Sequence, residues 1–190
     1  MKCYADIYDI SLDQPPHSRP SSILNFAREG VLAFHSLSKR SGLTGFRIGF
    51  MAGDPDILTL HARARARFGV GQPEFLQEGG VVAWKDDAHV EARRKIFSHR
   101  MQWIGKRMQK LGLMDEVPLG TFYLWCRIPQ RFGQDDVRFC TELAEKGVLF
   151  SPSSWLSENH VQGWFRIACT LDDEESEKAL AILEAFIAKG

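Results

Sequence analysis

Apolar and polar residues form blocks along this chain, and the spacing of the apolar residues changes near residue 54. Before that point two short, nearly continuous apolar runs stand out, Val31 to Leu37 and Phe46 to Gly53. Runs of this length are typical of strands in a sheet covered on both faces. We therefore expect these runs to be neighbouring strands of one sheet.

The segment before these strands is expected to be mostly irregular. The first ten residues, MKCYADIYDI, are typical of the end of a buried strand that continues into a loop. The stretch from Ser11 to Ser22 is rich in Pro, Ser and Asp, which predicts a loop. The next residues, Ile23 to Glu29, predict a short helix that ends at Gly30.

Helical spacing dominates after residue 54, where Asp54 and Pro55 form an N-cap and a first helical position. The pattern predicts helices from there to about Phe68, over Glu74 to Ala83 and over Ala88 to Leu111. The remaining chain predicts, in order, a strand at 121–128, a helix at 135–146, strands at 148–151 and 164–169, and a helix at 172–189.

This order of elements predicts an α/β fold in two parts. Residues 1–84 would be the last part of a large domain with a mostly parallel sheet. Residues 85–190 would be a linking helix and a small α+β domain.

Composition narrows the class of protein. The 190 residues are 44% hydrophobic and 25% charged, which argues against a disordered or collagen-like chain. The formal net charge is zero, whereas nucleic-acid binders usually carry a basic excess, so we expect no nucleic-acid partner. The sequence has no apolar run of membrane-spanning length and no signal-peptide pattern, which predicts a cytoplasmic protein. The four cysteines (Cys3, Cys126, Cys140 and Cys169) are too scattered to suggest a metal site and are expected to be reduced.

The strongest candidate functional residues lie in the segment FHSLSKRSGLTGFRIGF, residues 34–50. A lysine whose ammonium is destabilised by burial or by neighbouring charge can act as a nucleophile and form a Schiff base. Arg47 offers a planar fork suited to a phosphate, and Ser36 adds a hydroxyl donor. Lys39 with these two residues suggests a reactive lysine beside a phosphate site, although an isolated Lys-Arg pair is more often a solvated surface feature.

The residues SLSK at 36–39 and GLTGFRIG at 42–49 resemble the cofactor-lysine signature of class I/II aminotransferases, which are pyridoxal-phosphate (PLP) enzymes of fold type I. Three other segments occur in that family's order. They are CYADIY around Tyr4, GTFY at 120–123 and RIA at 166–168. Within the family, these sequence segments are most similar to those of succinyldiaminopimelate aminotransferases of lysine biosynthesis. The resemblance implies transfer of an amino group between an amino acid and a 2-oxo acid, and a homodimer in the full-length form.

The resemblance also assigns roles to individual residues. Lys39 would bind PLP as a Schiff base and carry a proton to and from the substrate. Ser36 and Arg47 would bind the cofactor phosphate, Tyr4 would contact the ring oxygen, and Arg166 would bind the substrate carboxylate.

The chain also departs from the family pattern. The family has an Asp three residues before the Tyr4 position, where it keeps the pyridine nitrogen protonated, but here that residue is Met1. Segments that precede this Asp in the family are also absent. The sequence therefore predicts the C-terminal half of an aminotransferase, from a truncated reading frame or a split enzyme.

Two alternatives remain open from the sequence. Ser36 and Lys39 match the S-x-x-K motif of serine acyl-transfer hydrolases, but the S-D-N and K-T-G motifs of that class are absent. In that class the serine begins a helix, whereas we expect Ser36 to follow a strand and precede a glycine-rich turn. The other alternative is a non-catalytic remnant that retains the fold.

Overall fold

The structure is a computed structural model that describes residues 6–14, 20–69 and 71–188. The chain divides into two units, Met1–Ile96 and Phe97–Gly190. Their boundary lies inside a long helix, α4 (Ala88–Lys110), whereas the sequence analysis began the second part at residue 85. The expected strand at the start of the chain falls largely on residues 1–5, which lie outside the described residues.

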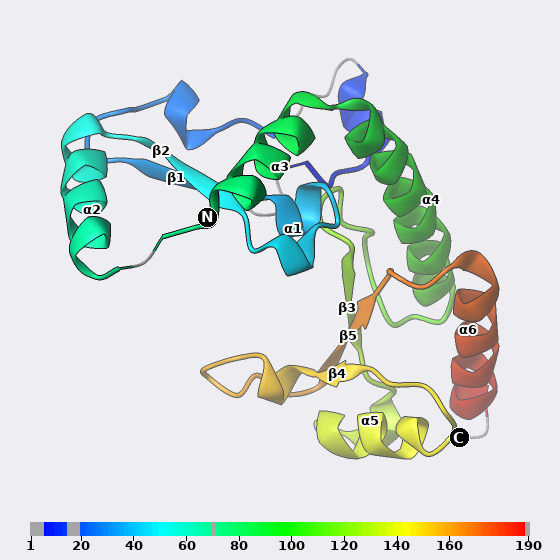
Figure 1. Ribbon diagram of the computed structural model, residues 1–190. Helices are drawn as coiled ribbons and strands as arrows, with labels where there is room; N and C mark the ends of the chain where they lie inside the picture. Colours follow the sequence, from blue (N-terminus) through cyan, green and yellow to red (C-terminus); the bar gives the residue numbers. More distant parts are fainter. Residues whose placement is uncertain (1–5, 15–19, 70, 189–190) are drawn as a thin grey trace. The chain divides into compact units, whose positions relative to one another are not determined.

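The first unit contains an antiparallel pair of strands, β1 (Leu32–Ser36) and β2 (Gly49–Gly53) (Figure 1). The register places Leu32 opposite Gly53 and Ser36 opposite Gly49. The prediction that the two apolar runs share one sheet is confirmed. The parallel sheet expected for this part does not appear among the described strands, because these two pair with each other in opposite directions.

The two strands are shorter than the apolar runs that predicted them, and they are not covered on both faces. Phe34 is 41% exposed and Phe50 is 44% exposed, which corrects the expectation of a fully buried sheet. The Phe50 ring stacks on His35 with a centroid distance of 4.9 Å and meets Trp84 edge-on at 4.7 Å. Individual aromatic side chains therefore cover this part of the sheet.

Among the described residues, four α-helices belong wholly or partly to the first unit, and three of them agree with the sequence analysis. These three are α2 (Pro55–Arg67), α3 (Glu74–Lys85) and α4. Asp54 begins α2 as predicted, since its side chain accepts from the backbone N–H groups of Asp56 and Ile57 at 2.9 and 3.3 Å. The fourth helix, α1 (Leu37–Arg40), was not predicted because its first residue, Leu37, continues the apolar run of β1.

Two predictions for the early chain are corrected. The expected loop from residue 11 to 22 contains part of a 3-10 turn, Ile10–Asp13, which Asp9 caps by accepting from the N–H of Ser11 at 2.9 Å. The expected helix at 23–29 is only a 3-10 turn, Ile23–Asn25, capped by the Ser22 side chain. In both cases a short polar side chain stabilises a single turn.

The second unit is built on a three-stranded antiparallel sheet with the order β3-β5-β4 (Figure 1). These strands are Tyr123–Arg127 (β3), Ser151–Pro152 (β4) and Trp164–Ala168 (β5). The strand expected at 148–151 is thus reduced to residues 151 and 152. Val148 instead turns its side chain into the core, and Leu149 is 82% exposed.

The core of the second unit lies on one face of this sheet. Leu124 and Cys126 of β3 and Phe165 of β5 are fully buried, as the two-residue period of a strand requires. They pack with buried residues of α4, α5 (Asp136–Ala144) and α6 (Asp173–Ala188), the last two close to their predicted bounds. The opposite face of the sheet carries the polar and aromatic residues discussed below.

The described residues include three of the four cysteines, Cys126, Cys140 and Cys169, and each is buried and free, as expected. Burial raises the pKa of each of these thiols to about 12. Among the described residues, no helix is both long and apolar enough to cross a membrane.

Candidate functional site

The predicted cofactor residues lie in the connection between β1 and β2. Ser36 ends β1 and caps α1, since its hydroxyl oxygen accepts from the N–H of Ser38 at 3.2 Å. Lys39 therefore lies on a helical turn that directly follows the strand and precedes the glycine-rich turn. Lys39 is half-buried and has an interaction partner in the structure. The hydroxyl hydrogen of Ser36 remains able to donate, because the oxygen is the acceptor in its bond to Ser38.

Close packing beneath α1 holds this connection in place. The N–H of Leu37 donates to the carbonyl of Ile48 at 3.1 Å, and both side chains are buried. Helix α3 approaches them at Gly80, where an added Cβ would lie 2.8 Å from Ile48 Cγ2 and 3.7 Å from Leu37 Cδ1. Only glycine allows this approach without displacing side chains.

Arg40, the residue after Lys39, anchors the end of α1. Its side chain is 6% exposed and donates to the carbonyl of Ala83 at 2.8 Å and to the Asp87 carboxylate. The guanidinium also lies 4.8 Å from the centre of the Trp84 ring. No sequence motif singled out Arg40, because these partners are more than forty positions away.

Arg47 occupies an unusual backbone conformation at the end of the same connection. Its φ of 53° and ψ of 37° lie in the left-handed region, which is uncommon for a residue with a side chain. Two contacts hold it there. Its Nη1 donates to the Thr44 carbonyl at 3.3 Å, and its own carbonyl accepts from Gln72 Nε2 at 2.7 Å. No sequence motif singled out Gln72, because it lies 25 positions from Arg47.

Arg47 also lines a groove of about 890 Å³ between β2 and α3. Arg65, Lys85 and Trp84 contribute to the same groove. Neither Ser36 nor Lys39 is among the described residues that line it. The structure thus brings the three predicted residues into one chain connection but not into one enclosed cavity.

Arg166 lies on β5 in the second unit, on the sheet face opposite the core. In register it is opposite Trp125 of β3 and Ser151 of β4. Its guanidinium carbon lies 4.4 Å from the centre of the Tyr123 ring, and Nη2 donates to Ser151 Oγ at 3.4 Å. Its Nε is buried and has no hydrogen-bond partner among the described residues. A buried donor of this kind fits a carboxylate ligand that accepts from a guanidinium.

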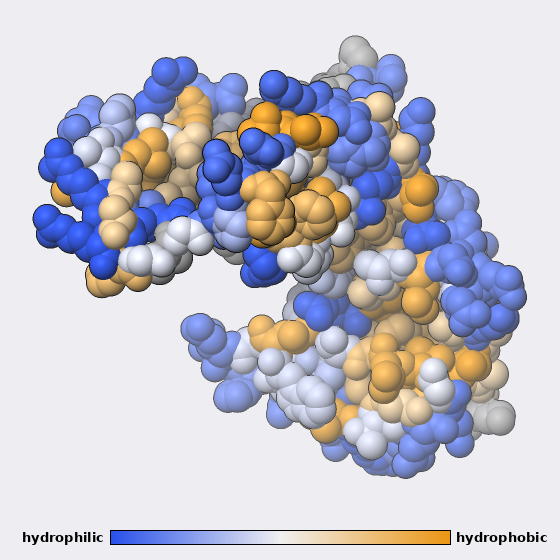
Figure 2. Space-filling view, viewed as in Figure 1, coloured by the Kyte–Doolittle hydropathy of each residue, from blue (hydrophilic) through white to orange (hydrophobic). Residues whose placement is uncertain are grey.

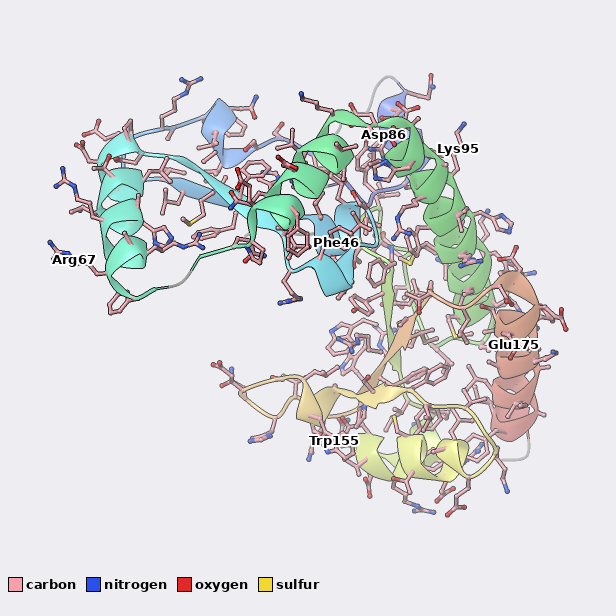
Figure 3. All side chains as sticks on the ribbon, viewed as in Figure 1. Phe46, Arg67, Asp86, Lys95, Trp155 and Glu175 are labelled. Carbon is pink, nitrogen blue, oxygen red and sulfur yellow. The ribbon has the colours of Figure 1, made fainter. Side chains whose placement is uncertain are left out.

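Asp136 fixes the loop that follows β4 and leads to Trp155, which Figure 3 labels. Its carboxylate accepts from Ser153 Oγ and from the N–H of Ser154, both at 2.7 Å, and from Ser154 Oγ at 3.1 Å. Burial acts to raise the pKa of Asp136, but these hydrogen bonds outweigh burial and hold the pKa below its usual value. No motif in the sequence singled out this residue.

Tyr4, the remaining predicted site residue, lies outside the described residues. Ser36, Lys39 and Arg47 belong to the first unit, and Arg166 belongs to the second. No cluster of His, Cys, Asp or Glu side chains that could hold a metal ion occurs in the described part of the chain.

The sequence model of the family described as "Aminotransferase class I and II" matches residues 4–183. The chain belongs to the class I and II aminotransferases. It is 33% identical over 168 residues to an LL-diaminopimelate aminotransferase of Nitratidesulfovibrio vulgaris, which covers 86% of this chain and 42% of that protein. It is 34% identical over 170 residues to the 4-dedimethylamino-4-oxo-anhydrotetracycline transaminase OxyQ of Streptomyces rimosus, over 87% of this chain and 46% of that protein.

Solved aminotransferase structures match the fold over nearly the whole chain. One from Neisseria meningitidis has a TM-score of 0.83 at 27% identity and covers 97% of this chain and 48% of its own. AspB from Helicobacter pylori has a TM-score of 0.82 at 29% identity and covers 100% of this chain and 49% of its own. The chain therefore corresponds to a part of the fold type I architecture and spans less than half of these relatives.

Class I and II aminotransferases depend on PLP, and the residues in the β1–β2 connection fit that cofactor. A lysine amine can bind an aldehyde, and a serine hydroxyl and an arginine guanidinium can bind a phosphate. The guanidinium of Arg47 is exposed, and its bond to Thr44 uses one of five donors.

The expected difference between Ser36 and the helix-starting serine of the S-x-x-K hydrolases is not found. Ser36 does begin a helix, because it is the N-cap of α1. The chain is distinguished from these hydrolases by its family match and by the absence of the S-D-N and K-T-G motifs from its sequence.

Proposed function

We propose that this chain is the C-terminal part of a PLP-dependent aminotransferase that moves an amino group between an amino acid and a 2-oxo acid. The observation that carries the proposal is the placement of Lys39 between Ser36 and Arg47 in one short connection of a chain that belongs to this family. In this proposal residues 1–84 belong to a large cofactor-binding domain, and residues 85–190 form the interdomain helix and the small domain.

Lys39 is the residue proposed to bind the cofactor and to move a proton at the substrate α-carbon. When bound, PLP supplies an aldehyde that takes up the amino group and a ring that withdraws electrons. Ser36 and Arg47 donate to the phosphate, and Tyr4 contacts the ring oxygen. The role of Arg47 is supported by the two contacts that keep its backbone in the left-handed region.

Arg166 is proposed to bind the α-carboxylate of the substrate. A guanidinium can hold a carboxylate through two parallel hydrogen bonds, which orients the bond that is to be broken. The buried Nε and the packing on Tyr123 support this role, because they hold the guanidinium plane while a donor remains available.

For the substrate we propose an LL-diaminopimelate-type amino donor, either free or N-succinylated, with 2-oxoglutarate as acceptor. This substrate is supported by the name of the diaminopimelate relative. It is also supported by the similarity of the sequence around Lys39 to that of succinyldiaminopimelate aminotransferases. The OxyQ relative acts on a different class of compound, so a panel of amino donors is needed to decide.

The complete site is proposed to need the segments that the relatives have and this chain does not match, supplied by a longer form of the protein or by another chain. In the complete form we expect a homodimer in the cytoplasm. The alternative is a non-catalytic remnant, and the exposed Phe34 and Phe50 on the β1–β2 sheet are compatible with either case.

The test is covalent trapping at Lys39. The purified chain is incubated with PLP and reduced with borohydride, and the modified peptide is identified by mass spectrometry. Modification of Lys39 that disappears in Lys39→Ala and persists in Lys95→Ala, a variant of an exposed lysine on α4, supports the proposal. Uniform modification of exposed lysines contradicts it.

Turnover is then measured with an amino donor and 2-oxoglutarate, for the chain alone and after mixing with the N-terminal half of the Nitratidesulfovibrio relative. Activity only in the mixture supports a split or partial enzyme. If neither sample transfers an amino group although Lys39 is modified, the remnant alternative holds.

A further inference from the structure

A second set of reactive side chains lies at the C-terminal end of α1. Ser41 Oγ is 2.9 Å from His89 Nε2, and His89 Nδ1 is 2.8 Å from Asp86 Oδ2. Asp86, labelled in Figure 3, follows α3 and precedes α4, which carries His89. A nucleophile, a base and an orienting carboxylate in this order are the arrangement that activates serine in acyl-transfer enzymes.

The Asp86 carboxylate selects the tautomer of His89 that this chemistry requires. A carboxylate can only accept, so the Nδ1 atom of His89 carries the hydrogen and Nε2 presents its lone pair to the Ser41 hydroxyl. The second oxygen of Asp86 accepts from the N–H of Ala88 at 2.9 Å, which orients the carboxylate. The hydrogen bond from His89 lowers the pKa of Asp86 most, and the bond from Ala88 lowers it further. Asp86 is therefore ionised at neutral pH.

A cation lies beside the nucleophile. The residue after Ser41 is Gly42, which is exposed and has a φ of 73°. A Cβ placed on Gly42 would be 2.8 Å from Arg93 Nη1 and 3.2 Å from Nη2, so the guanidinium lies directly against this glycine. Positive charge at this place is suited to the oxyanion that forms when a serine attacks a carbonyl.

We propose that Ser41, His89 and Asp86 form a serine acyl-transfer site for small activated carboxylic esters, with Arg93 stabilising the oxyanion. His89 is 29% exposed and Gly42 is open to solvent, so a small ester can reach the hydroxyl. This proposal does not depend on the PLP function, because it uses neither Lys39 nor Ser36.

In the reaction, a bond forms between Ser41 Oγ and the acyl carbon, and the bond from that carbon to the alkoxy oxygen breaks. The hydroxyl proton moves to His89 Nε2 and then to the departing alkoxide. A water molecule next attacks the acyl carbon and gives one proton to Nε2. The bond from that carbon to Ser41 Oγ then breaks, and Nε2 returns the proton to Oγ. The carboxylic acid leaves, and the enzyme is restored without any oxidant or metal.

The test uses a fluorophosphonate probe and the intact chain. Ser41 Oγ attacks phosphorus, fluoride leaves, and the labelled peptide is identified by mass spectrometry. We expect labelling at Ser41, loss of labelling in Ser41→Ala, and unchanged labelling in Ser38→Ala, which alters a half-buried serine of α1, the helix that Ser41 caps.

Two further variants separate catalysis from packing. His89→Gln can still accept a hydrogen bond from Ser41 but cannot take up its proton, and Asp86→Asn can still accept from the Ala88 N–H but no longer selects the tautomer. Each should slow labelling by at least roughly tenfold. The thermal unfolding midpoint of each variant is measured to confirm that it is folded.

The rate of p-nitrophenyl acetate hydrolysis should follow the same order across the variants. The proposal is overturned if the folded parent chain is not labelled at Ser41, or if His89→Gln is labelled as fast as the parent. Absence of PLP binding would leave these expectations unchanged, so the two proposals fail separately.

Discussion

The side-chain amide of Gln72 donates a 2.7 Å hydrogen bond to the backbone carbonyl of Arg47. This bond ties the loop before α3 to a residue whose backbone is in the left-handed region. In turn, Gln77 Nε2 donates to the carbonyl of Gln72 at 2.8 Å, which fixes the loop. A residue in another loop thus positions the arginine proposed to bind the cofactor phosphate.

We therefore expect Gln72→Glu to weaken binding of PLP without weakening binding of pyridoxal, which lacks the phosphate. The glutamate has a similar size but cannot donate to the Arg47 carbonyl when ionised. A lost hydrogen bond is worth about 0.5 to 1.5 kcal/mol, so the PLP dissociation constant should rise by roughly two- to tenfold. The measurement is titration by absorbance with each ligand. An equal loss of both ligands would point to general unfolding instead.

Replacement of Arg47 by glycine and by alanine should separate backbone strain from ligand binding. Glycine adopts a positive φ without steric cost, whereas alanine does not, so Arg47→Gly should be more stable than Arg47→Ala by about 1 kcal/mol. Both variants should lose the preference for PLP over pyridoxal. Chemical denaturation measures the first effect, and equal stability of the two variants would contradict the backbone argument.

Gly80→Ala should destabilise the first unit, although alanine favours a helix. The new Cβ would lie 2.8 Å from Ile48 Cγ2, and overpacking of this kind costs about 1 to 3 kcal/mol. Gly79→Ala is the matched control on the same helix. Its Cβ would meet only Phe46 Cε1 at 3.4 Å, so it should gain up to about 1 kcal/mol from helix propensity. Denaturation of both variants tests the contact, and a stabilised Gly80→Ala would show that Ile48 moves freely.

Arg166→Lys should weaken substrate binding more than cofactor binding. Lysine retains the charge but loses the planar fork, and a charge-assisted hydrogen bond is worth roughly 1.5 to 3 kcal/mol. In a complemented or full-length protein, the affinity for the amino donor should fall by that amount while PLP absorbance is kept. Arg127→Lys is a useful comparison, because Arg127 lies on the neighbouring strand and binds Asp115. If PLP binding falls as much as substrate binding, Arg166 is a structural residue.

Asp136 should make the second unit sensitive to acid. Its pKa is lower in the folded chain than the value of about 3.9 expected in the unfolded chain, so its ionised form stabilises the fold above that pH. The contribution is lost as the pH falls through the folded pKa. Asp136→Asn should be less stable near neutral pH but should change less between pH 5 and about pH 2. Unfolding curves across this range test the expectation, and parallel curves for both proteins would contradict it.

Much of the helical structure, and the family of this chain, could be predicted from the sequence alone. Asp54 and Pro55 mark the start of α2 because a cap acts on its own neighbours. The signature around Lys39 identified the family for a similar reason, since its residues are adjacent in the chain. Local signals of this kind can be recognised in the sequence because they do not depend on contacts with distant residues.

Contacts between distant residues could be decided only by the tertiary structure. The sequence extended β1 through Leu37, because an apolar residue continues a strand and a buried helix equally well, and the register with β2 ended the strand at Ser36. The bond from Gln72 to Arg47 and the contact between Ser41 and His89 join residues far apart in sequence. Such pairs carry no local pattern, because their hydrogen bonds depend on where packing places each backbone.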